Sequence, residues 1–74
     1  EVFRWAADRV QTQVKEATWR AFWMTSIELK TIPEVAQSLG ISIGAVHIAR
    51  SRVRSRLREQ VLQWDDIKGD QDDT

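Results

Sequence analysis

The chain has 74 residues, no cysteine and a formal net charge of zero at pH 7. This length predicts one domain near the lower size limit for unaided folding, and the lack of cysteine excludes a disulfide framework and a thiolate metal site. No apolar run approaches the length of a membrane span and no signal-peptide pattern opens the chain, so we expect a cytoplasmic protein without a membrane partner. Because the chain begins with Glu1 rather than Met, we expect it to be part of something longer.

The zero net charge conceals a strong asymmetry along the chain. Residues 1–41 are balanced, residues 42–58 carry five arginines and no acid, and residues 59–74 carry six acids against one lysine. A basic segment this dense indicates an anionic polymer as the partner. The simpler alternative is a solvated face on a long helix.

The first half of the chain is predicted to form two helices. Apolar residues recur at three- and four-residue steps over residues 2–14, as in an amphipathic helix. A second helix is expected to restart near Lys15 or Glu16 and to run to Leu29, with one long bent helix as the alternative.

The second predicted helix is apolar on several faces and must therefore be covered on several faces. Two interpretations are open. Either all of this surface is internal core, or a domain this small leaves part of it, at Trp19, Trp23 and Ile27, for a protein partner.

The segment from Thr31 to Ser51 has the pattern of two helices joined by a tight turn. Thr31 and Glu34 form a predicted capping box at the start of a short helix over residues 32–39. Gly40 is expected to end that helix in the left-handed conformation, and Ser42 is expected to cap the next one. These signals predict a helix-turn-helix, whereas an ordinary helical hairpin would use the glycine only as a C-cap.

A long helix is predicted from Ile43 to about Trp64. One stripe of it is apolar and should face the core, namely Val46, Ala49, Val53, Leu57, Val61 and Trp64. Arg50 lies at the edge of this stripe and would have to snorkel. The acidic residues 65–74 are expected to form a disordered tail.

Together these elements predict an all-α fold, a small bundle of about four helices that contains a helix-turn-helix with a long C-terminal recognition helix. The domain is expected to cover residues 1–64. The sequence contains no Gly-rich phosphate loop, no metal-spaced cluster and no Ser/His/Asp set, so we expect neither enzymatic activity nor a cofactor or metal. His47, the single histidine, is interpreted as a groove or surface residue.

Position along the long helix predicts which residues would contact DNA. Groups in the first two turns of a groove-inserted helix reach base edges, and later groups run along the phosphates. The expected groove residues are Ser42, Gly44, His47, Ile48 and Ser51. The expected phosphate contacts are Arg50, Arg52, Arg54 and Arg58, of which Arg52 is the best placed to reach a guanine.

Residues from about Ala17 to Val61 resemble region four, the C-terminal domain of the extracytoplasmic-function sigma factors of bacterial RNA polymerase. The run TxxEVAxxLGISxGAVHxARSRVRxRLRE is similar to that family's S-x-x-E-I-A-x-x-L-G-x-S-x-G-T-V-K-x-x-x-x-R-A-R-x-x-L-R-E. The resemblance covers about 45 of the 74 residues. His47 stands where the family usually has Lys, Ala49 and Arg50 replace an Arg-Leu pair, and Lys30 replaces an apolar residue.

The resemblance implies a role in transcription initiation. The second helix of the helix-turn-helix would read the minus-35 element of double-stranded promoter DNA, while another side of the domain holds the β-subunit flap of core RNA polymerase. Anti-sigma factors commonly clasp this region of the family, and the apolar residues Trp19, Trp23 and Ile27 are the expected site for one. Nothing in the chain corresponds to region two, the domain that melts the minus-10 element.

Two other functions fit parts of the sequence. The output domain of a response regulator has a similar helix-turn-helix, but its usual Leu-Thr-x-Arg-Glu step is missing here. A helical protein-interaction module would leave the arginines solvated or paired with an acidic partner. Heparin retention and its dependence on salt would separate DNA binding from the second alternative.

Overall fold

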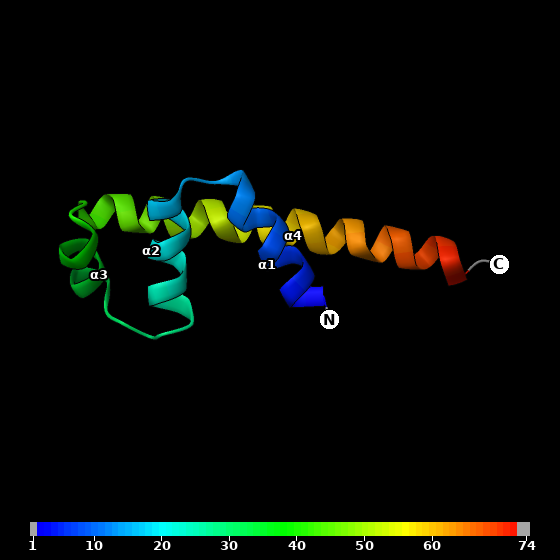
Figure 1. Ribbon diagram of the computed structural model, residues 1–74, viewed down its shortest axis with the longest axis horizontal. Coiled ribbons are helices and arrows are strands. Elements are labelled where there is room, and N and C mark those ends of the chain that lie inside the picture. The colour runs from blue at the N-terminus through cyan, green and yellow to red at the C-terminus, as the bar shows by residue number, and fades with distance from the viewer. Residues whose placement is uncertain (1, 73–74) are drawn as a thin grey trace.

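The computed structural model describes the backbone of residues 2–72 and the side chains of residues 2–64. The described chain consists of helices α1 (Val2–Gln13), α2 (Glu16–Ser26), α3 (Ile32–Leu39) and α4 (Ile43–Asp72), without strands. The predicted all-α bundle is therefore confirmed. α4 forms the long axis of a molecule measuring 51 × 18 × 16 Å, and α1 and α2 cross it while α3 lies near its start (Figure 1).

The break between α1 and α2 decides between the two alternatives for the first half of the chain, because the helices are separate and the chain leaves helical structure at residues 14–15. α2 ends at Ser26, three residues before the predicted end at Leu29. The N–H groups of Ile27 and Glu28 both donate to the Trp23 carbonyl, at 2.9 and 3.1 Å. Leu29 then adopts a φ of 59°, in the left-handed region, so the helix cannot continue through it.

Local signals around α3 operate as the sequence predicts. Thr31 Oγ1 accepts a hydrogen bond from the Glu34 N–H at 3.3 Å, and the Glu34 carboxylate accepts from the Thr31 N–H at 3.3 Å, which completes the capping box. Gly40 ends α3 with a φ of 68°. Ser42 Oγ accepts from the Ala45 N–H at 3.0 Å and so caps the start of α4. The predicted helix-turn-helix connection is therefore present.

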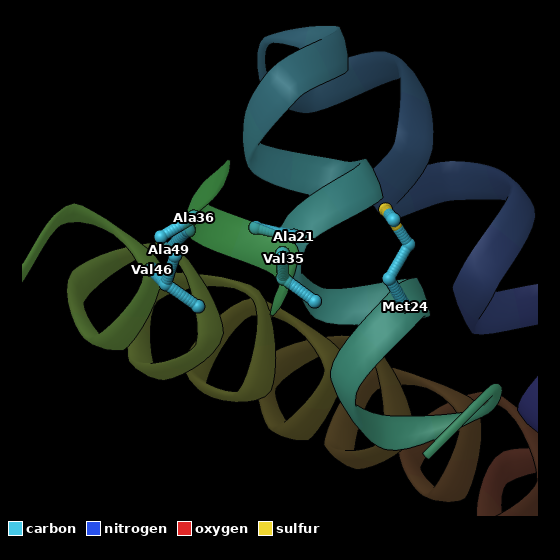
Figure 2. Close-up of a cluster of buried hydrophobic side chains, with 6 residues drawn as sticks. All are labelled: Ala21, Met24, Val35, Ala36, Val46 and Ala49. Carbon is cyan, nitrogen blue, oxygen red and sulfur yellow. The ribbon is translucent and has the colours of Figure 1, made fainter. Parts of the chain in front are cut away.

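Two clusters of buried side chains hold the helices together. The first joins α2, α3 and α4 through Ala21, Met24, Val35, Ala36, Val46 and Ala49 (Figure 2). The second joins α1, α2 and α4 through Ala7, Val10, Trp19, Phe22 and Val53. Small residues at Ala36 and Ala49 lie against Val46, which is fully buried. Because α2 and α4 contribute to both clusters, the core is shared along the first half of α4.

The buried stripe of α4 departs from the prediction at its distal end. Val61 is 37% exposed, whereas Gln60 is only 5% exposed. At about 100° per residue, Gln60 lies about 40° from the centre of the Val46 stripe and Val61 about 60° to the other side. The position nearer the centre is buried although its residue is polar, so the placement of Val61 in the core was wrong.

A polar and aromatic contact between α1 and α4 explains how Gln60 is tolerated in the interior. Arg9 Nε donates to Gln60 Oε1 at 2.7 Å. The Arg9 guanidinium lies 4.9 Å from the centroid of the Trp5 ring, and Trp5 packs edge-on against Trp64 at 5.2 Å. This contact, formed by Trp5, Arg9, Gln60 and Trp64, is called the α1–α4 clasp below. It satisfies a buried amide that would otherwise be costly.

The C-terminal end of α4 also differs from the prediction, since the helix continues to Asp72 and does not end near Trp64. The side chains of residues 65–72, and residues 73–74 altogether, lie outside the described part of the chain. The boundary of the domain at residue 64 and the predicted disorder of the acidic tail stay predictions.

Candidate nucleic-acid interface

The helix that follows the tight turn presents its outer face to solvent. All five predicted groove residues are exposed, namely Ser42, Gly44, His47, Ile48 and Ser51. Ile48 is 60% exposed, which is unusual for a large apolar side chain and leaves it free to contact a thymine methyl. The periodicity of the buried stripe was sufficient to find these positions, because residues opposite a core stripe must face outward.

The predicted phosphate contacts are not equivalent in the structure. Arg52, Arg54 and Arg58 are exposed, whereas Arg50 is half-buried. The Nε atom of Arg50 is buried and has no hydrogen-bond partner within the described residues. The predicted position of Arg50 at the edge of the core is therefore confirmed.

Arginines lie on both sides of a crest of small hydroxyl residues. Ser51 and Ser55, called the serine crest below, line both of the shallow hollows on this helix. His47, Arg50, Arg54 and Arg58 line the hollow on one side and are called the Arg54 row. Arg52, Arg56 and Glu59 line the other, together with Ile48, and these three are called the Arg52 row. The predicted DNA contacts did not include Ser55 and Arg56, although the 3.6-residue period places both beside the predicted set.

The electrostatics of this face follow from the excess of arginines over acids. Residues 42–58 include five arginines and no carboxylate. Among the described residues the ion pair that the structure shows joins Lys30 to Glu28 at 3.6 Å, and it involves none of these arginines. Within the described residues no ion pair neutralises these arginines, and Glu59 is the one acid in the lining of the two hollows. A surface of this kind attracts polyanions and supplies the donors that phosphate oxygens accept.

A second surface, built by α1, α2 and the start of the α2–α3 connection, carries the apolar residues predicted to bind a protein partner. It contains a hollow of about 680 Å³ whose lining includes Phe3, Trp19, Trp23, Met24 and Lys30. Trp23 is half-buried there, and Phe3 is 43% exposed.

The three predicted partner-binding residues are not brought together equally at this hollow. Trp19 is only 7% exposed and belongs to the core cluster with Phe22 and Val53, so most of its surface is used within the chain. Ile27 is 43% exposed and lies outside the lining of the hollow. Trp23 is the one of the three that combines an accessible surface with a place in the hollow.

Comparisons with known proteins gave no match to a family model, to a curated protein or to a solved structure. In the described part of the chain, every helix is too short or too polar to cross a lipid bilayer.

Proposed function

We propose that this domain binds double-stranded promoter DNA through the outer face of α4, as region four of an extracytoplasmic-function sigma factor that reads the minus-35 element. The observation that carries the proposal is the Arg54 row, which contains three arginines and no acid and lies on the helix that directly follows the tight turn. Small or short residues at Gly44, Ala45 and the serine crest allow the helix backbone to approach the base edges closely. The sequence resemblance over about 45 residues supports the same assignment.

The partner side of the proposal uses the hollow formed by α1 and α2. Its lining combines the aromatic surface of Phe3 and Trp23 with a charged rim that includes Glu28 and Lys30. An apolar surface with a polar rim suits a protein partner. We infer that the β-subunit flap of core RNA polymerase docks here, and that an anti-sigma factor would compete for the same surface.

The test is DNA binding by the chain and its variants, with duplexes selected from a random-sequence library compared with unselected duplexes. Arg54→Ala and Arg58→Ala should each weaken binding to both kinds of duplex and reduce the salt slope by about one. His47→Ala should instead change the sequence preference, because it lies in the second turn of α4 and faces outward.

Arg20→Ala provides a matched control for the loss of one positive charge. Arg20 is exposed and lines the hollow on α1 and α2, so its loss should leave the salt slope unchanged. Equal effects of the Arg20, Arg54 and Arg58 changes would contradict the α4 face as the DNA-binding surface. Retention of sequence preference in His47→Ala would contradict the groove assignment.

A further inference from the structure

The two sides of the serine crest differ in how freely their arginines can bind an anion. In the Arg54 row, Arg50, Arg54 and Arg58 recur every four residues, a separation of about 6 Å along the helix axis for each step. The lining on this side contains three arginines and no acid, whereas the Arg52 row contains two arginines and Glu59. The formal charge is thus +3 on one side and +1 on the other, with His47 counted as neutral.

Arg56 is further restricted by its contact with α1. Its Nη1 donates to Gln13 Oε1 at 3.4 Å, and its side chain is half-buried. Binding a phosphate through Arg56 would therefore compete with an existing contact, and Glu59 would repel the same phosphate. Of the two arginines in the Arg52 row, only Arg52 is exposed, and within the described residues it makes no ion pair.

Arg50 belongs to the Arg54 row and differs from the other arginines of that row in its burial. Its Nε lies buried without an acceptor, and an unsatisfied buried donor is costly. The conformation of the free protein therefore leaves hydrogen-bonding capacity of this guanidinium unused. Arg50 is only half-buried and lines the same hollow as Arg54, so the accessible part of its side chain adds positive charge on this side.

We infer that α4 holds the two strands of a duplex unequally, with most phosphate contacts made to the strand that faces the Arg54 row. This inference rests on the proposed DNA binding. It adds the identity of the DNA strand whose phosphates the domain chiefly contacts. The three arginines supply the charge, and Ser51 and Ser55 lie beside them as hydroxyl donors. The opposite strand is contacted chiefly through Arg52.

The experiment uses a selected duplex in which three consecutive phosphates are replaced by neutral methylphosphonates, scanned along one strand and then along the other. At low salt, the most sensitive window on one strand should weaken binding by about tenfold or more, and the most sensitive window on the other strand by less than about threefold. Equal sensitivity of the two strands, with binding of the unmodified duplex intact, would overturn the inference and leave the proposed function standing. Failure to bind any duplex would overturn both.

Two variants test whether the more sensitive strand is the one that contacts the Arg54 row. In Arg54→Gln, neutralising the sensitive strand should cost less than in the unaltered protein, because one of the three arginine contacts to that strand has already been lost. Arg52→Gln is the matched control, since it removes one exposed arginine from the same helix and should leave the sensitive strand as sensitive as in the unaltered protein. A strand difference that disappears in Arg52→Gln but persists in Arg54→Gln would reverse the assignment and overturn it. Unchanged melting temperatures would show that both variants fold.

Discussion

At the scale of single residues, Leu29 is the position where the backbone is least suited to its side chain. It adopts a φ of 59° and is 80% exposed, so the left-handed conformation is not offset by burial of the side chain. We expect Leu29→Gly to stabilise the domain by about 0.5–1 kcal/mol, because glycine avoids the steric cost of this conformation but loses more entropy on folding. Urea unfolding would measure the change.

Leu29→Ala is the control for this substitution. It removes the same exposed apolar surface but keeps a Cβ atom, so it should show none of the gain. Equal stabilities of the glycine and alanine variants would show that the backbone conformation at this position is not the cause.

Glu34 makes the stability of the helix-turn-helix depend on pH. Hydrogen bonds from the Thr31 hydroxyl and N–H lower the pKa of Glu34 below its ordinary value. Because the folded-state pKa is the lower one, the stabilisation is complete above the unfolded-state pKa and is lost as the pH falls through the folded-state value.

We therefore expect Glu34→Gln to lose most stability relative to the unaltered protein near neutral pH and progressively less in acid. Thermal unfolding across the acid range would measure this convergence. Thr31→Ala removes the hydroxyl that donates to the Glu34 carboxylate but keeps the backbone N–H, so it should show a weaker form of the same behaviour. A stability difference that is constant with pH would contradict a role for the Glu34 charge.

At the scale of the helices, the sequence predicted those helix ends that are set by caps and turn residues nearby in the chain. α3 begins and ends where the capping box and Gly40 placed it, and α4 begins directly after Ser42. Caps and glycine turns involve residues three or four apart, so the sequence contains all of their partners. The exposed groove residues followed from the same local periodicity.

The features that sequence reasoning missed depend on helices distant in the chain. Gln60 is buried because Arg9 reaches it from 51 positions away, and Arg56 is half-buried beside Gln13 of α1. Trp19 is buried because α1 and α4 cover it. No periodicity within one helix predicts where another helix will lie, so the contact that restricts Arg56 could not be predicted.

The α1–α4 clasp makes a prediction at this scale. Arg9→Met should cost about 1–2 kcal/mol, because it removes the donor to the buried Gln60 oxygen. Gln60→Leu should cost less, since the exposed Arg9 can bond to water instead. The double variant should be more stable than Arg9→Met alone, with a coupling of about 1 kcal/mol in a urea-unfolding cycle. Strictly additive effects would show that the two side chains do not interact.

At the scale of the whole molecule, the sharing of α2 and α4 between two buried clusters implies that the domain unfolds as one unit. Val46→Asp would place a charge at a fully buried site in the first cluster, at a cost of several kcal/mol against a total stability of about 5 kcal/mol. We expect it to unfold α1 as well, although α1 packs on the second cluster. Amide hydrogen exchange resolved along the chain would measure this.

Ile48→Asp is the matched control for the buried charge. It lies two residues further along α4 and is 60% exposed, so the same substitution should leave exchange in α1 protected. If the amides of α1 stayed protected from exchange in Val46→Asp while those of α3 exchanged freely, the two clusters would unfold separately.

The positions of the four tryptophans give the domain a spectroscopic reporter of its own assembly. Trp19 and Trp23 belong to one helix, with ring centroids 6.0 Å apart, so they remain neighbours wherever α2 is helical. Trp5 and Trp64 are 5.2 Å apart only because α1 lies across α4. Exciton coupling between the second pair of indoles therefore depends on tertiary structure alone. In a circular dichroism titration, the signal removed by Trp5→Phe reports the docking of α1, independently of helix content and without an added label.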